Sequence, residues 1–282
     1  MSKVIVLTDS TAYIPQEYIN SLPIEVVPLL VTWDGKTYRD GIDITPQEFY
    51  TRLAKSSTLP TTSQVSVNTF QEKFKELLDK GYQVMTMPIS SGISGSVFSA
   101  FQAKESFKTD PVEVIDTKLV SMALGFQVLT VARAAKEGAS LAECKVLALK
   151  AYEHIGVYFT VDTLKYLHAG GRIGGAQRLL GTALKIKPIL AIRDGKIDAV
   201  KSVMTSAKAI QAMIDLVEND INGRTPVRLS VFHANVPEIA QELQDRIAKQ
   251  FNAEEAILSW VSPVVGSHVG PGTLSIAYQA GL

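Results

Sequence analysis

The fold is decided by residues 84–96, which read VMTMPISSGISGS. The apolar run from Val84 to Ile89 has the length of a buried strand, and the small polar residues 90–96 lead directly into a segment with helical spacing. A strand, a short loop and a helix in this order form the repeating unit of a sheet covered by helices. The stretch therefore predicts an α/β fold.

Strands and helices alternate around this unit. Capping boxes at Thr45–Glu48 and Ser140–Glu143 each predict the start of a helix. The polar stretch 56–66 is too rich in Ser, Thr and Pro to predict either a strand or a helix. The strands expected in the first half are 4–8, 24–32, 84–89, 112–115 and 157–161, and the further helices are 67–79 and 121–136. The alternation predicts a mostly parallel sheet with helices on both faces.

The second half begins with four glycines in residues 168–175, which predict a hinge or loop. Further strands are expected on both sides of Asp194-Gly195 and at 228–234, 257–261 and 274–278, with helices at 206–217 and 236–251. We therefore predict an N-terminal α/β domain, residues 1–160, and a C-terminal α/β domain with a mixed sheet, residues 161–282.

Composition narrows the classes of function. Lys plus Arg equals Asp plus Glu at 28 each, so the net charge is zero and nothing favours nucleic-acid binding. Cys144 is the only cysteine, which excludes an intramolecular disulfide. The apolar run that follows Lys3 is too short for a signal peptide, and no run is long enough to span a bilayer. A cytoplasmic protein is expected. The histidines show no metal-ligand spacing, so no metal is predicted.

The loops at the carboxyl ends of parallel strands are where ligands bind in open α/β sheets. Residues 90–96 combine hydroxyl groups, free backbone N–H groups and the positive end of a helix dipole, which predicts an anion site. The segment 61–64 adds hydroxyls, and 266–272 places His268 in a glycine-rich turn. Neither a phosphate-loop motif nor a dinucleotide motif occurs. The residues alone leave open a carboxylate, a small phosphate, or a loop that serves only as a cap and turn.

The order of these loops resembles the DegV family of bacterial fatty-acid-binding proteins, over nearly the whole chain. The strings that carry the resemblance are Thr8-Asp9-Ser10-Thr11, Thr62-Ser63-Gln64, Ser90-Ser91-Gly92-Ile93-Ser94-Gly95-Ser96, Tyr166-Leu167-His168-Ala169-Gly170-Gly171-Arg172-Ile173 and Gly266-Ser267-His268-Val269-Gly270-Pro271-Gly272. Each string is weak alone, but five in order are specific.

The resemblance implies a long-chain fatty acid bound in a cleft between two domains. The residues that match the family's carboxylate contacts are Thr62 and Ser94, with His268 and Arg172 at or near the head group and Ser63 and Gly95 beside them. The resemblance also implies a partner, a separate ATP-binding fatty acid kinase subunit that phosphorylates the carboxyl group for phospholipid synthesis. On that view the chain is a carrier with only transient membrane contact. It has no cofactor and is not itself an enzyme.

Two other functions remain open at this point. Gly92-Ile93-Ser94-Gly95-Ser96 lies between a strand and a helix as a nucleophile elbow does, although its last position is not glycine. A serine-hydrolase-like esterase would use Ser94 and His268, with Asp162 as a third member. A lipid sensor without a kinase partner is the other alternative.

Overall fold

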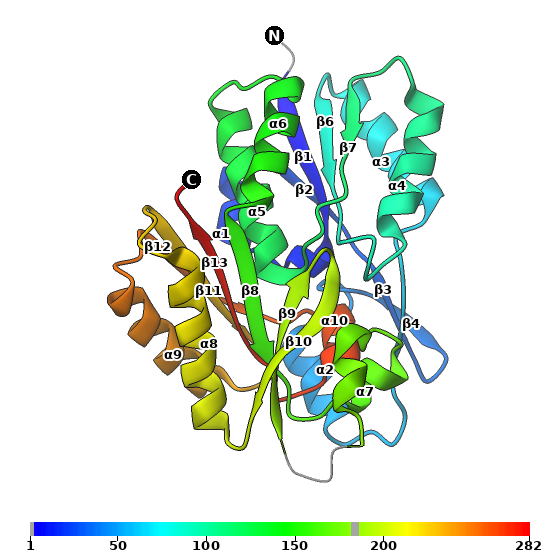
Figure 1. The fold of residues 1–282 in the computed structure, drawn as a ribbon. Helices are drawn as coiled ribbons and strands as arrows, with labels where there is room; N and C mark the ends of the chain where they lie inside the picture. Colours follow the sequence, from blue (N-terminus) through cyan, green and yellow to red (C-terminus); the bar gives the residue numbers. More distant parts are fainter. Residues whose placement is uncertain (1–2, 182–185) are drawn as a thin grey trace.

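In the residues that the computed structural model describes, 3–181 and 186–282, the strands form three sheets (Figure 1). The first is a four-stranded sheet in which all neighbours are parallel. Its order is β2 (Ile24–Val27), β1 (Val4–Asp9), β6 (Gln83–Met87) and β7 (Val112–Val114). All six residues of β1 are buried, as expected for a strand whose two faces are both covered.

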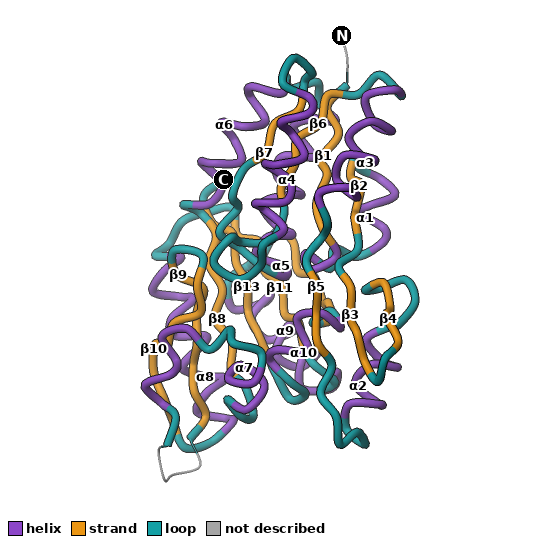
Figure 2. The backbone as a smooth tube through the Cα atoms, turned by 90° about the vertical axis from the view of Figure 1, so that its right-hand side faces the viewer, coloured by secondary structure: helices purple, strands orange, loops and turns teal. Residues whose placement is uncertain are grey.

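Helices cover both faces of this parallel sheet. Figure 2 shows α6 (Leu141–Tyr152) on one side of it, and α1 (Gln16–Ser21) and α3 (Val67–Asp79) on the other. The helix α4 (Ser96–Lys104) packs against α3 and β7. The predicted architecture of the first half is therefore confirmed.

The second sheet has six strands and is mixed, as predicted. Only β11 (Val227–His233) and β12 (Glu255–Trp260) are parallel neighbours in it. Its order is β10 (Lys196–Val203), β9 (Lys187–Arg193), β8 (Ile155–Thr160), β13 (Leu274–Ala280), β11 and β12. The helices α8 (Ser206–Ile221) and α9 (Pro237–Gln250) pack on this sheet.

The helix α5 (Ser121–Lys136) joins the two large sheets. It packs against β1 of the parallel sheet and also against β8 and β13 of the mixed sheet. Twelve of its sixteen residues are buried, because both sides of the helix are covered. The core is therefore continuous from one sheet to the other.

The predicted place of residues 157–161 in the fold was wrong. They were expected to form the last strand of the N-terminal sheet, but β8 pairs with β9 and β13 in the mixed sheet. An apolar strand carries no local signal that selects one of two sheets. The domain boundary at residue 160 stays a prediction, and the pairing of β8 favours a boundary before Ile155.

Residues 24–32 form two strands rather than the single one predicted. Pro28 interrupts the run, and β3 (Leu30–Trp33) belongs to a small antiparallel sheet with β4 (Lys36–Arg39). The third strand of that sheet is β5 (Thr61–Ser63), inside the polar stretch that predicted neither element. Pairing with β3 fixes β5 in an extended conformation despite its weak local preference.

The helix starts predicted by the capping boxes are confirmed. Thr45 and Ser140 cap α2 (Pro46–Leu53) and α6 in complete capping boxes. Residues 67–79 form α3 with the predicted bounds. None of the helices in residues 3–181 and 186–282 is long and apolar enough to cross a bilayer.

Asp40 connects the small-sheet region to the mixed-sheet half. Its carboxylate accepts hydrogen bonds from Ser10 Oγ at 2.8 Å and from the backbone N–H of Val264 at 3.3 Å. The side chain is 2% exposed, and this burial raises its pKa to about 7. Across the same contact, Tyr50 donates to the carbonyl of Val261 at 3.0 Å.

Asp40→Asn is expected to change how stability depends on pH. When the pKa of a carboxyl group is higher in the folded protein than in the unfolded protein, the folded protein holds its proton more tightly. The fold therefore loses stability as the pH rises from the unfolded pKa to the folded pKa. The variant lacks this titration. Its free energy of unfolding, taken relative to that of the wild type, should therefore be about 2–3 kcal/mol greater at pH 8 than at pH 5. Urea denaturation of both proteins at the two pH values measures the difference. An equal difference at both would contradict a raised pKa for Asp40.

Candidate functional site

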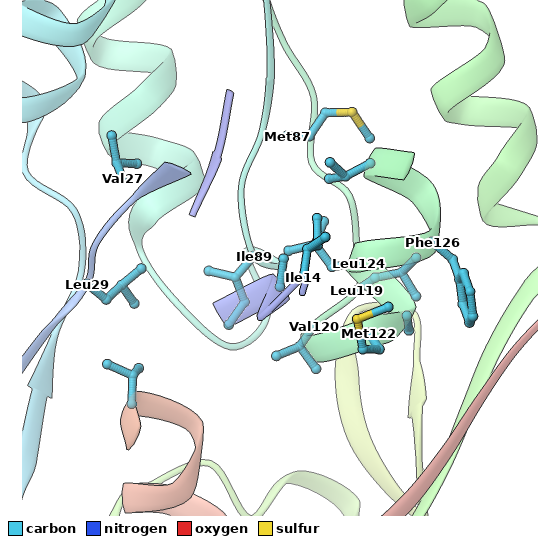
Figure 3. Close-up of a cluster of buried hydrophobic side chains, with 14 of the residues drawn as sticks. Ile14, Val27, Leu29, Met87, Ile89, Leu119, Val120, Met122, Leu124 and Phe126 are labelled. Atoms are coloured by element: carbon cyan, nitrogen blue, oxygen red, sulfur yellow. The ribbon is translucent and has the colours of Figure 1, made fainter. Parts of the chain in front are cut away.

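A cavity of about 350 Å³ lies where the two large sheets approach each other. It is lined by residues that follow β2 and β6, by the start of α5, by α10 (Pro263–Val269) and by strands of the mixed sheet. Figure 3 shows Leu29, Ile89 and Val120 extending from three separate segments of the buried cluster beside this space. The volume is within the range of small-molecule sites, about 300–1,000 Å³.

Most of the cavity wall is apolar. The apolar side chains are Leu29, Ile89, Ile93, Val120, Val157, Phe159, Ile192, Ile197, Phe232, Val261, Val264, Val265 and Val269. The polar residues are Thr62, Ser63, Gln64, Ser94, Ser121, Arg172, His268, Thr273 and Ser275, and the backbone of Gly95 completes the lining. Such a site suits a ligand with a long apolar part and a small polar end.

All six predicted site residues line this cavity. Thr62 and Ser63 lie on β5, and Ser94 and Gly95 lie in the loop before α4. Arg172 follows α7 (Lys165–Ala169), and His268 lies on α10. The fold thus brings together four segments that are far apart in the sequence, while the role of each residue in binding stays a prediction.

His268 lies on a helix and not in the glycine-rich turn that the sequence predicted. The side chain of Ser262 caps α10 and Pro263 occupies its first turn, and the helix ends at Val269, where Gly270 with its positive φ follows. His268 Nε2 is 2.8 Å from Thr62 Oγ1. Burial, together with the positive charge of Arg172, lowers the pKa of His268 to about 4, so the ring is neutral at pH 7.

The Ser94 loop packs closely against its neighbours. Ser94 Oγ is 3.1 Å from Ser96 Oγ, and a Cβ on Gly95 would come within 1.9 Å of Gln64 Oε1. Only glycine fits at position 95 while Gln64 keeps this place. Gln64 in turn donates to Ser99 Oγ at 2.8 Å, which joins α4, the helix that follows the loop, to the segment that carries Thr62.

Arg172 supplies the positive charge at the polar end of the cavity. Its Nε donates to the carbonyl of Ile93 at 3.2 Å, and Nη1 donates to the carbonyl of Gly170 at 2.7 Å. These bonds hold an exposed guanidinium beside the Ser94 loop. The polar end therefore combines hydroxyl groups, a neutral imidazole and one cation, a set that suits an anion.

A serine-hydrolase triad is not assembled in the described part of the chain. His268 Nε2 faces Thr62 instead of Ser94, and His268 Nδ1 has no hydrogen-bond partner there. Asp162, the expected third member of the triad, forms an ion pair in which Lys187 Nζ lies 2.5 Å from its Oδ1. The geometry that the hydroxyl of Ser94 would need for activation as a nucleophile is therefore missing.

The sequence did not single out several polar residues of the cavity. Gln64 belongs to the same motif as Thr62 and Ser63, but nothing in the sequence indicates that it lines the cavity. Ser121, Thr273 and Ser275 carry no local signal, because their position depends on how α5 and β13 pack. The apolar wall could not be predicted for the same reason.

Comparisons with known proteins agree over nearly the whole chain. The family model described as "Uncharacterised protein, DegV family" matches residues 3–281. A DegV domain-containing protein of Staphylococcus aureus is 37% identical over 279 residues, which are 98% of this chain and 97% of the relative.

Two solved structures are similar in fold and sequence. A fatty-acid-binding DegV family protein from Thermus thermophilus has a TM-score of 0.91 and 32% identity, and 99% of each chain is covered. DegV from Bacillus subtilis, a fatty acid binding protein, has a TM-score of 0.91 and 33% identity, with 99% of this chain and 100% of the other covered. The sequence match, the shared fold and the matching motifs lead to one conclusion: the chain belongs to the DegV family.

Proposed function

We propose that this protein binds one long-chain fatty acid in the cavity, with the tail against the apolar wall and the carboxylate at the polar end. The main support for the proposal is the lining of the cavity. It combines an apolar wall with a polar cluster formed by Thr62, Ser94, Arg172 and His268. The fatty-acid binding of the Thermus and Bacillus relatives supports the same ligand class.

The energetics favour the tail as the main source of affinity. Burial of one methylene group contributes about 0.8 kcal/mol, so a tail of about fifteen carbons contributes on the order of 10 kcal/mol before the costs of association and chain ordering. A carboxylate removed from water must be compensated by donors or a positive charge. The hydroxyls of Thr62 and Ser94 and the guanidinium of Arg172 can supply both. The head group thereby sets the orientation of the ligand.

Uptake of palmitate by the delipidated protein tests this function. Isothermal titration calorimetry should show one palmitate bound per chain, with a negative heat-capacity change from burial of the tail. Hexadecyltrimethylammonium is the comparison probe, because its alkyl tail is only about one carbon longer and ends in a cation that the donors and Arg172 reject. Equal affinity for both probes would contradict a carboxylate site, and the absence of palmitate binding would contradict the function itself.

We propose further that the protein is a cytoplasmic carrier that presents the carboxyl group to a separate ATP-dependent fatty acid kinase. The exposed position of Arg172 beside the Ser94 loop supports a head group close to the surface. Acyl phosphate should form from ATP and the palmitate-loaded protein only when the ATP-binding subunit from the same organism is added. Its absence with both proteins present would leave a lipid sensor as the better description.

The esterase alternative has a direct test. If Ser94 were a nucleophile, the purified protein would hydrolyse a p-nitrophenyl acyl ester, and Ser94→Ala would abolish the reaction. The pairing of His268 with Thr62 favours no turnover above the rate in buffer.

A further inference from the structure

The hydroxyl groups of Thr62 and Ser94 each lie within hydrogen-bond distance of a second side chain. Ser96 lies behind Ser94 and is 0% exposed, and His268 lies behind Thr62. A hydroxyl group has one proton and two lone pairs. When neighbouring groups donate hydrogen bonds to the lone pairs, its own proton is left to point toward another acceptor. The two pairs of side chains therefore determine whether the hydroxyl groups act as hydrogen-bond donors or acceptors toward a ligand.

The direction of the first pair follows from the partners of Ser96. Its Oγ accepts a hydrogen bond from the backbone N–H of Val65 at 3.3 Å, and within residues 3–181 and 186–282 its other partner is Ser94 Oγ at 3.1 Å. If Ser94 donated to Ser96, the proton of the buried Ser96 hydroxyl would have no acceptor, which costs free energy. Ser96 therefore donates to Ser94.

Ser94 is then left with its proton free for a ligand. Its Oγ accepts from the hydroxyl of Ser96 and also from the backbone N–H of Ser96 at 3.3 Å. Both lone pairs are in use, so the remaining function of this hydroxyl is to donate. Ser94 lines the cavity, and its proton has the cavity to point into.

The second pair has the same direction. His268 Nδ1 is buried without a hydrogen-bond partner among the described residues, and a Cβ on Gly170 would come within 2.1 Å of it. Nδ1 is unpaired in either tautomer, and an orphaned buried N–H is rarer in folded proteins than an under-satisfied acceptor, so we assign the proton of the neutral ring to Nε2. Nε2 therefore donates to Thr62 Oγ1, and Thr62 donates its own proton into the cavity.

We infer that Ser96 and His268 are positioning residues that turn the hydroxyl protons of Ser94 and Thr62 into the cavity, so that the site offers paired donors and selects an ionised carboxylate over a neutral alcohol. The inference rests on the proposed function and goes beyond it, because it assigns the charge state of the ligand and a role to Ser96. A carboxylate accepts both protons, whereas an alcohol must also place a proton of its own.

The test compares palmitate with 1-hexadecanol, which has the same tail. Ser96→Ala should lower the affinity for palmitate about tenfold, the effect of one weakened hydrogen bond to a charged group, and leave that for hexadecanol within about twofold. Hexadecanol is spared because it can donate its own proton to the lone pair of Ser94 that the variant frees. Ser267→Ala is the matched control, since this buried hydroxyl donates to the carbonyl of Pro263 within α10.

A second pair of variants tests His268 independently and covers the case in which Ser96→Ala does not fold. His268→Gln keeps an N–H donor near Thr62 and should retain more of the selectivity for palmitate than His268→Ala. Equal loss for both lipids in Ser96→Ala, or equal selectivity in the two His268 variants, would overturn the inference while wild-type palmitate binding stands. If the wild type bound neither lipid, the proposed function would fail first, and the inference with it.

Discussion

Replacing Thr62 and Ser94 together by alanine is expected to lower the affinity for palmitate on the order of 100-fold. Each hydroxyl can donate one hydrogen bond to the carboxylate, and such bonds to a charged group contribute about 1.5–3 kcal/mol each. The two side chains line the same polar end of the cavity, so their effects need not add fully. Displacement of a fluorescent fatty acid from the delipidated proteins measures the change.

A control for this double variant is available on the same elements. Thr61→Ala with Ser267→Ala also removes two hydroxyl groups, one beside Thr62 on β5 and one beside His268 on α10, from residues outside the cavity lining. This control should bind palmitate as the wild type does. Wild-type affinity in the Thr62 and Ser94 variant, with the fold intact by circular dichroism, would show that the head group lies elsewhere.

Shortening the ligand is expected to have the largest effect of all. Decanoate lacks about six of the methylene groups of palmitate, and at about 0.8 kcal/mol each their loss should weaken binding by about two to three orders of magnitude after ordering costs. Titration with decanoate, dodecanoate, myristate and palmitate measures the dependence. The affinity should rise with each step until the tail fills the cavity.

The same series separates the roles of tail and head group. In the variant that lacks the Thr62 and Ser94 hydroxyls, the slope of affinity against chain length should be unchanged, because the apolar wall is intact. An affinity that does not depend on chain length in the wild type would mean that the tail stays outside the cavity.

Much of the fold could be predicted from local signals. The capping boxes at Thr45 and Ser140 and the turn at Asp194-Gly195 depend only on neighbouring residues, and the structure has a helix start or a hairpin at each. The errors concern pairing. Whether the strand at residues 155–160 joins one sheet or the other depends on partners more than a hundred residues away, at 274–280.

The candidate site was predictable to the extent that its residues lie in short polar motifs. Thr62 and Ser94 lie in such strings, and both line the cavity. Ser96 also lies in a motif, but its place behind Ser94 follows from how the loop folds onto Val65, which no spacing indicates. Apolar wall residues such as Phe159 and Phe232 resemble any core residue in the sequence, because only the approach of the two sheets exposes them to a cavity.

Native mass spectrometry of the purified protein, followed by solvent extraction and identification of co-purified lipid, shows directly whether the cavity holds a fatty acid. We expect one long-chain fatty acid per chain, lost on delipidation and restored by added palmitate. A protein that purifies empty and still takes up no long-chain fatty acid when one is supplied would contradict it.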